Sequence, residues 1–210
     1  MQIPRFIVVC LLIIAPASLR MLAPEWNVVP IAAIALYCGA HFRNRGLAFS
    51  IPLLAMFLGD ILLAVQTRNP SLYLFHATMP FVYGCYVFSV AMGIGLQRHW
   101  DRLPEGISSR EAAPKTEAGR WHSALRARVL PITTLTIAGS ILFFLVTNFG
   151  CWLMFHTYPK TWHGLLDCYL AGVPYFRGTL CGDLIGSAIL FGGEQLLRHD
   201  PLAVPQSERF

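Results

Sequence analysis

The sequence LAFSIPLLAMFLGDILLAVQ, residues 47–66, is 20 residues long and contains one charged side chain, Asp60. That length matches the ~20 apolar residues that a helix needs to cross a bilayer. A second aspartate, Asp183, lies in a similar apolar setting, the stretch CGDLIG at residues 181–186. A carboxylate within a membrane span costs about 2.5–3.5 kcal/mol on insertion scales, so it usually faces a cavity or a partner. We therefore expect both aspartates to face the interior of a bundle of membrane helices.

The two Gly-Asp pairs belong to a longer and weak internal repeat. Asn27 precedes Asp60 by 33 residues, and Asn148 precedes Asp183 by 35 residues. Repeats that carry polar groups at matching depth are typical of transporters, in which inverted halves meet near the substrate. The sequence is thus compatible with a 3+3 inverted repeat.

The composition is that of an integral membrane protein. Of the 210 residues, 55% are hydrophobic and 13% are charged, whereas a soluble domain carries about 25% charged residues. We predict an all-α fold, a polytopic membrane helix bundle with about six transmembrane helices. The predicted spans are residues 4–20, 28–42, 47–66, 72–96, 129–156 and 178–197.

One polar stretch interrupts what we predict to be a single membrane domain over residues 1–210. Residues 97–128 are rich in Ser, Pro, Glu and Arg without hydrophobic periodicity, which predicts a cytoplasmic linker. This linker divides the first three or four helices, in residues 1–96, from the remaining helices, in residues 129–210.

Residues 164–176 are too short to span a membrane comfortably, and they contain Asp167 and Pro174. We interpret them as an interfacial or re-entrant helix at the outer face that leads into the last span. A seventh span, which would place the C-terminus outside, is the alternative.

The distribution of basic residues sets the orientation. With both termini inside, twelve Lys and Arg residues fall on inner segments and four on outer segments, as the positive-inside rule requires. We predict a multi-pass protein of the cell inner membrane with both termini cytoplasmic. The first span also resembles a secretory signal peptide, with Arg5 before an apolar run and Ala15-Pro16-Ala17 after it. We favour a retained helix, because Pro16 makes a poor cleavage site.

Polar side chains gather at one depth of the predicted membrane. At a rise of 1.5 Å per residue, Asn27, Asp60, Asn148 and Asp183 fall in the outer half of the membrane. Two aromatic residues, Trp152 and Tyr169, lie at the same level. We predict that the ligand-binding residues are Asn27, Asp60, Asn148, Trp152, Tyr169 and Asp183. Helix capping and interhelical hydrogen bonds are the alternative role for the polar residues, and an interfacial aromatic belt is the alternative for Trp152 and Tyr169.

Missing motifs exclude several classes of function. The sequence contains no Walker A loop, no Ser-His-Asp order with a nucleophile elbow, and no haem or flavin fingerprint. We expect no catalytic residue, no metal ion and no cofactor. The net charge of +5 follows the topology, so we expect no nucleic-acid partner. The six cysteines form no Cys-x-x-Cys pair; buried free thiols are expected, with a pairing among Cys151, Cys168 and Cys181 left open.

A ridge of small residues occupies the last predicted span. Gly178, Gly182 and Gly186 are spaced four apart, and small residues at this spacing let a second helix approach closely. Ala35 and Gly39, and likewise Ala55 and Gly59, repeat the pattern. We expect the ridge to pack against the second or third span or against a partner subunit.

Several stretches resemble an uncharacterised family of small bacterial integral-membrane proteins that carries a transport label. They are residues 20–40, 144–152, 164–169, 174–177 and 190–192, of which Thr147-Asn148-Phe149-Gly150-Cys151-Trp152 is the most specific. In size and hydropathy that family is similar to the substrate-binding S components of energy-coupling-factor (ECF) transporters. This resemblance implies six helices and small-residue motifs that dock on a coupling subunit. The Ala-rich motif here lies on the second span, whereas S components carry theirs on the first.

Together these features predict a membrane component that binds and transports a small-molecule solute from the outer face. Its expected partners are membrane lipid and, by resemblance, a coupling subunit and ATPase chains. One alternative is a membrane enzyme that uses Asp60 and Asp183 as acid and base with help from His163. The other is a non-transporting membrane scaffold assembled through the glycine ridges.

Overall fold

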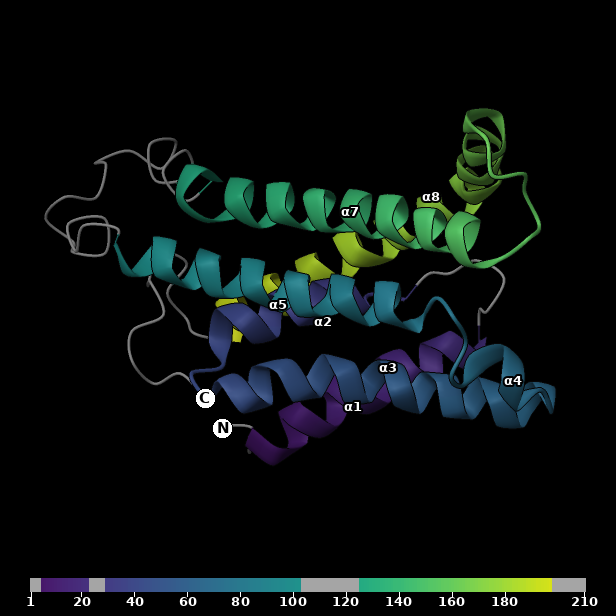
Figure 1. The fold of residues 1–210 in the computed structure, drawn as a ribbon. Coiled ribbons are helices and arrows are strands. Elements are labelled where there is room, and N and C mark those ends of the chain that lie inside the picture. Colours follow the sequence, from purple (N-terminus) through teal and green to yellow (C-terminus); the bar gives the residue numbers. More distant parts are fainter. Residues whose placement is uncertain (1–4, 23–28, 103–124, 198–210) are drawn as a thin grey trace, which may run out of the picture.

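The structure, a computed structural model, describes residues 5–22, 29–102 and 125–197. These residues form helices and contain no strand, which confirms the predicted all-α bundle (Figure 1). In chain order the elements are α1 (Arg5–Leu22), α2 (Ile31–His41), α3 (Arg45–Thr67), α4 (Pro70–Tyr73), α5 (Met79–Asp101), the π-helical turn η2 (Leu125–Val129), α7 (Leu130–Met154) and α8 (Trp162–Leu197).

Among the described residues, three helices are long and apolar enough to cross a membrane. They are Arg45–Thr67, Met79–Asp101 and Ala127–Met154, and Val8–Met21 and Ile31–His41 are shorter apolar helices. On α7 the side chains of Ile137, Ile141 and Leu145 are exposed at a spacing of four residues, so one face of this helix carries an apolar stripe. An apolar stripe on the outside of a bundle suits lipid, and we treat the chain as a membrane protein.

The helices alternate in direction, as contacts at their two ends show. Asp183 of α8 bonds Ala33 near the start of α2, while Glu194 of α8 contacts His41 at the end of α2, so these two helices run the same way. By contrast, Asp183 and Ser187 of α8 bond Ser140 and Thr136 of α7, respectively, so α7 and α8 are antiparallel. Any up-and-down bundle alternates like this, and the inverted repeat therefore remains a prediction.

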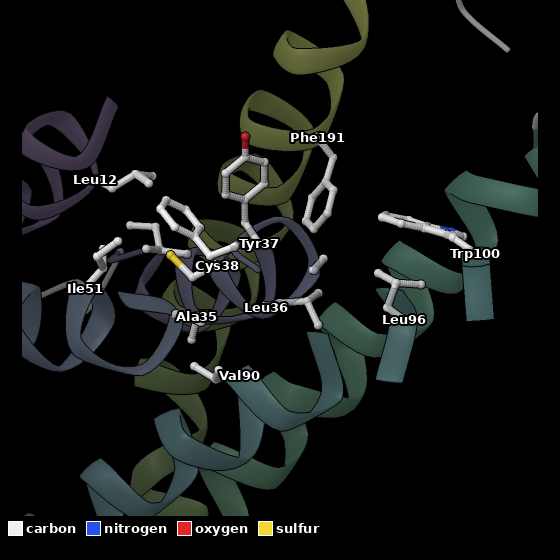
Figure 2. Packing of buried hydrophobic residues seen from close by; sticks show 14 residues of the cluster. Leu12, Ala35, Leu36, Tyr37, Cys38, Ile51, Val90, Leu96, Trp100 and Phe191 are labelled. Atoms are coloured by element: carbon white, nitrogen blue, oxygen red, sulfur yellow. The ribbon is translucent and has the colours of Figure 1, made fainter. Parts of the chain in front are cut away.

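The short helix α2 lies at the centre of the bundle. All 11 of its residues are buried, and it contacts α3, α5, α7 and α8. Figure 2 shows Leu36, Tyr37 and Cys38 surrounded by side chains from α1, α3, α5 and α8, such as Val90 and Phe191. The hydrophobic core of the bundle is thus built around a helix only about 17 Å long at 1.5 Å per residue.

Two glycines let α2 and α5 cross in backbone contact. A Cβ on Gly39 would lie 2.1 Å from the carbonyl oxygen of Val90, and a Cβ on Gly93 would lie 2.1 Å from that of Leu36. No side chain fits either position without pushing the helices apart. The small-residue motif at Ala35 and Gly39 is therefore a helix contact within this chain.

The segment 164–176 is helical and leads directly into the last predicted span, while its interfacial or re-entrant position stays a prediction. It forms the first part of α8, which continues from Trp162 to Leu197 through Pro174. Membrane helices tolerate an internal proline when neighbouring groups satisfy the freed carbonyl, and a proline commonly bends the helix. The green and yellow parts of α8 point in different directions in Figure 1.

The predicted linker, residues 97–128, begins in the sequence before α5 has ended. Residues 97–101 belong to α5, where Gln97 and Trp100 are buried, and η2 with its neighbours lies at the other end. Most of the linker, both termini and Asn27 lie outside the described residues, so the orientation of the chain remains a prediction.

Candidate functional site

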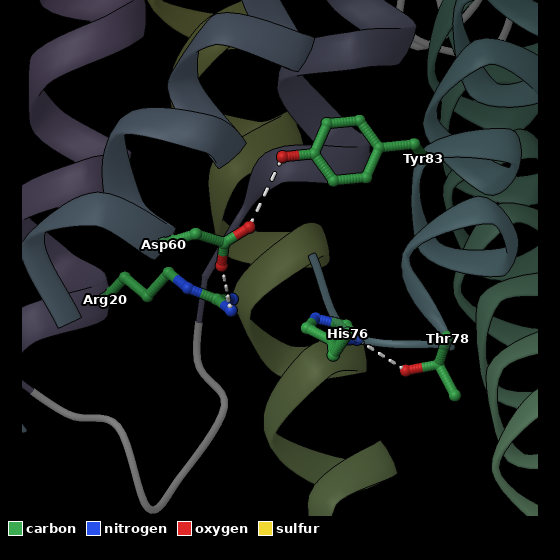
Figure 3. Close-up of polar contacts among 5 residues, drawn as sticks. All are labelled: Arg20, Asp60, His76, Thr78 and Tyr83. Atoms are coloured by element: carbon green, nitrogen blue, oxygen red, sulfur yellow. Dashed lines mark hydrogen bonds and ion pairs between the residues drawn. The ribbon is translucent and has the colours of Figure 1, made fainter. Parts of the chain in front are cut away.

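Asp60, in the third quarter of α3, is completely buried and forms an ion pair with Arg20 of α1. Arg20 Nη2 donates to Asp60 Oδ1 at 2.8 Å, and the two side chains are 18% and 0% exposed, respectively. Figure 3 shows the guanidinium extending from the end of α1 toward the carboxylate. A buried carboxylate needs a partner of this kind, because an unpaired charge in a low-dielectric interior is costly.

The glycine before Asp60 makes room for this arginine. A Cβ on Gly59 would lie 2.8 Å from Arg20 Cδ and 3.7 Å from the Cα of Ala17. The Gly-Asp pair therefore has a packing explanation: glycine admits the arginine stem, and aspartate binds its head.

Tyr83 of α5 contacts the second oxygen of the same carboxylate. Its hydroxyl donates to Asp60 Oδ2 at 3.3 Å, which is longer than the usual 2.5–3.0 Å range for O–H···O bonds. Oδ1 is thus held firmly by Arg20, and Oδ2 is held weakly.

Asp183, on α8, caps the start of α2 from a distance of 150 residues in sequence. Its Oδ1 accepts from the backbone N–H of Ala33 at 3.1 Å, and its Oδ2 accepts from Ser140 Oγ at 2.9 Å. The N-cap residue of α2 is Pro30, which makes no side-chain cap bond, and a carboxylate suits the positive end of a helix dipole. Capping was the alternative role for this residue, and it is the role the geometry shows.

Arg20 and Asp183 line the same internal cavity. Its volume is about 20 Å³, enough for about one water molecule. The lining residues are Arg20, Val29, Ala32, Tyr86, Phe143, Thr179 and Asp183. Arg20 therefore connects the two aspartates, since it bonds Asp60 and shares a cavity wall with Asp183. We call this part of the molecule the aspartate end.

The other predicted site residues lie along the α7–α8 hairpin. Asn148 Nδ2 donates to Phe144 O within α7, and a Cβ on Gly172 of α8 would lie 2.4 Å from Asn148 Oδ1. Trp152 Nε1 donates to Pro159 O, and Tyr169 Oη donates to Leu145 O, both at 2.9 Å. None of the three lines the cavity between Arg20 and Asp183.

The structure also places the other residues singled out in the sequence, except Asn27. Asn27 lies outside the described residues, and His163 is exposed in the first turn of α8. All six cysteines are free thiols.

In the glycine ridge, Gly182 is buried, and a Cβ on Gly186 would lie 2.3 Å from Pro30 Cβ. The ridge therefore packs against α2 at Gly186, as predicted.

Sequence reasoning missed Arg20, Ser140 and Tyr83 as partners of the aspartates. Arg20 was counted only as a basic residue of an outer segment. The sequence did contain a signal for Arg20. Two carboxylates inside apolar spans require a cation to balance their charge, and Arg20 lies at the end of the first span.

A second polar cluster lies at the opposite end of α2, and we call it the histidine end. His41 Nε2 is 2.6 Å from Glu194 Oε2, and His41 Nδ1 is 3.1 Å from Tyr37 O. Since a carbonyl only accepts, the Tyr37 contact favours the tautomer with the hydrogen on Nδ1. The rings of Tyr37, Trp100 and Phe191 pack on the imidazole at centroid distances of 4.3–5.9 Å.

Comparison with protein families gives one result. The family described as "Family of unknown function (DUF6580)" matches residues 1–205, and the chain belongs to it. No curated protein and no solved structure matches the chain.

Proposed function

We propose that this DUF6580 protein binds a small solute within the membrane and serves as a component of a transport system. One observation carries the proposal. Arg20 pairs with the buried carboxylate of Asp60 and lines a cavity that the buried Asp183 also lines. Ionisable groups inside a membrane bundle are expensive, and they mark substrate or ion pathways more often than they stabilise a fold.

The arginine has unused binding capacity. Arg20 Nε is buried and has no hydrogen-bond partner among the described residues. A guanidinium offers five N–H donors in a fixed fork, so a purely structural pair would be expected to use more of them. The Arg20 side chain is 18% exposed, so it can move toward the surface.

The small volume of the cavity corresponds to a closed state. With room for about one water, the site admits a solute only after a side chain that contacts Asp60, either Arg20 or Tyr83, moves away from it. We propose that the solute exchanges for this contact. Because the sequence contains no ATP-binding loop, energy for uptake would come from partner chains or from an ion gradient.

The geometry favours binding over acid–base catalysis. Asp60 is tied to a guanidinium and Asp183 to a helix N-terminus, and no hydrogen bond between described atoms joins the two carboxyls. In an acid–base pair, both carboxyl groups reach the same substrate, and their different surroundings keep one protonated and the other ionised.

The test is a thermal-unfolding screen of the full-length protein in lipid nanodiscs against small amines, amino acids, carboxylates and sugars. A ligand at 100 times its Kd stabilises the folded state by about 2.7 kcal/mol. We expect solutes that stabilise wild type to have no effect on Asp60→Asn or Arg20→Gln.

The matched control is Asp167→Asn, which removes an exposed carboxylate from α8 and should keep every wild-type response. If Asp60→Asn and Arg20→Gln also keep all these responses, the site is structural and the proposed function is wrong.

A further inference from the structure

An apolar groove opens beside the aspartate end, between α3 and the start of α5. Its volume is about 340 Å³, and it is lined by Phe57, Phe75, Met79, Pro80 and Tyr83. Ligand sites for small molecules are typically about 300–1,000 Å³ and mostly apolar, with few polar groups. The groove has the size and the lining of such a site, without a polar group of its own.

Tyr83 joins this groove to Asp60. Its ring forms part of the groove wall, and its hydroxyl makes the long 3.3 Å contact with Asp60 Oδ2. Figure 3 shows the Tyr83 side chain extending from α5 to the carboxylate of α3. The weakly held oxygen of Asp60 is therefore separated from the groove by one tyrosine side chain, whereas Arg20 holds the other oxygen at 2.8 Å.

The rim of the groove is strained. Phe75 has a φ of 59° and a side chain that is 85% exposed. A non-glycine residue in the left-handed region is uncommon, and such strain concentrates at binding sites and ligand clamps. The segment is held in place, because His76 Nδ1 lies 2.8 Å from Thr78 Oγ1 and the N–H of Met79 donates to His76 O (Figure 3).

We propose that the groove and Asp60 together bind an organic cation with an apolar body. The ammonium group would take the place of the Tyr83 hydroxyl at Asp60 Oδ2, and the body would lie on Phe57, Phe75 and Met79. Aromatic rings also attract cations through their faces, and three of the five lining residues are aromatic. This inference rests on the proposed solute site at Asp60 and names its class of substrate.

A lipid acyl chain is the competing occupant, since the groove opens on the outside of a membrane protein. Binding of an acyl chain would depend on the apolar lining of the groove and would not depend on the charge of Asp60. The position of the Asp60 carboxylate behind Tyr83 favours a cation, because a buried acceptor with one weak partner gains most from a new charged donor.

The experiment measures binding of three probes to the full-length protein in lipid nanodiscs, with empty nanodiscs subtracting partition into lipid. The probes are n-octylammonium, 1-octanol with the same body and no charge, and ethylammonium with the same charge and almost no body. We expect n-octylammonium to bind at least about tenfold more tightly than either control, since each half of the ligand adds its own contacts.

Variants separate the two halves of the site. Asp60→Asn should weaken n-octylammonium binding about tenfold or more, and Phe57→Ala should weaken it about fivefold or more. Tyr83→Phe removes the competing hydroxyl and should tighten binding, an effect that a merely structural tyrosine would not produce. The matched control is Phe149→Ala on α7, because Phe149 and Phe57 are 40% and 38% exposed, respectively; it should bind like wild type.

Each contrary result has a distinct meaning. Equal binding of ethylammonium and n-octylammonium, with dependence on Asp60, overturns the groove and leaves the proposed solute site standing. Equal binding of 1-octanol and n-octylammonium, without dependence on Asp60, makes the groove an acyl-chain site and overturns the inference. Absence of n-octylammonium binding above empty nanodiscs overturns it as well, even where other solutes still respond to Asp60→Asn.

Discussion

The two ends of α2 solve the same electrostatic problem with different chemistry. At the aspartate end, the carboxylate of Asp183 caps the N-terminus of the helix. At the histidine end, Arg45 donates to the carbonyls of Gly39 and Phe42 near the C-terminus. Both placements match the helix dipole, which favours anions at the start and cations at the end. An interhelical ion pair accompanies each cap.

The ion pairs differ in permanence and in surroundings. Arg20 and Asp60 pair beside a cavity of about 20 Å³, and Arg20 Nε is unpaired among the described residues. The histidine end also borders a small pocket, of about 30 Å³, and Trp100 Nε1 there is likewise buried and unpaired among the described residues. His41 and Glu194 pair under a cover of aromatic rings, and the imidazole charge depends on a proton. The comparison is compatible with the proposal that a solute binds at the aspartate end, whereas the ring contacts at the histidine end join α2, α5 and α8.

The largest predicted effect comes from breaking the permanent pair. Arg20→Met leaves the fully buried Asp60 without its cation and should lower the free energy of unfolding by about 3–5 kcal/mol. Asp60→Asn should cost less, because the 18% exposed Arg20 can turn toward the surface. Reversible unfolding in mixed micelles would measure the difference.

The double variant Arg20→Met/Asp60→Leu supplies the control, since replacing both charges by apolar side chains is often neutral. Arg177→Met, which removes an exposed arginine of α8, should also be neutral. A double variant that is as unstable as Arg20→Met would contradict the account of a stranded carboxylate.

A second prediction tests whether the middle of α2 holds both ends in register. Gly93→Ala places a Cβ about where the carbonyl oxygen of Leu36 lies, so it should destabilise the bundle by about 1–3 kcal/mol through overpacking. Gly95→Ala, two residues away on the same helix, meets open space and should be neutral or stabilising by up to about 1 kcal/mol. Similar melting temperatures for the two variants would mean that α2 and α5 do not cross in backbone contact.

The third prediction compares Asp183, which caps the start of α2, with Glu194, which pairs with its last residue. Asp183→Asn keeps one acceptor and loses a charge-assisted bond, so we expect a loss of about 1.5–3 kcal/mol. Glu194→Gln keeps a side-chain oxygen that can accept from His41 Nε2, so it should cost less, about 0.5–1.5 kcal/mol, the net contribution of one hydrogen bond. Chemical denaturation of both variants in one detergent ranks them, and a larger loss for Glu194→Gln would reverse the roles assigned to the two ends.

Much of the fold could be predicted from the sequence, because apolar length alone identifies membrane helices. The predicted span 47–66 matches α3 to within two residues at each end, whereas the predicted span 72–96 begins seven residues before α5 begins and ends five residues before α5 ends. Charge cost alone indicated that Asp60 and Asp183 are buried. The continuation of α8 through Pro174 was missed, because a proline that breaks a helix in water is tolerated in a membrane when its neighbours supply the missing contacts.

The candidate site was predicted only in part, for a geometric reason. Counting residues gives depth along a helix, but successive side chains turn by about 100° around it. Asn148, Trp152 and Tyr169 therefore have a similar predicted depth to the aspartates and yet lie along the α7–α8 hairpin. The reach of Arg20 from α1 into α3 depends on which helices are neighbours, and the sequence does not state this.

The dependence of α2 on α8 has a consequence for biosynthesis. An 11-residue helix is about half the length that a membrane insertion site accepts as a span, so α2 must enter the bilayer together with α3, from which only residues 42–44 separate it. The side chains that cap its start and pair with its last residue, Asp183 and Glu194, belong to the last described helix. Chains are made from the N-terminus, and a nascent chain therefore holds an incomplete centre until α8 has been made. A truncation anywhere before α8 leaves that centre open and exposes the whole product to membrane quality control.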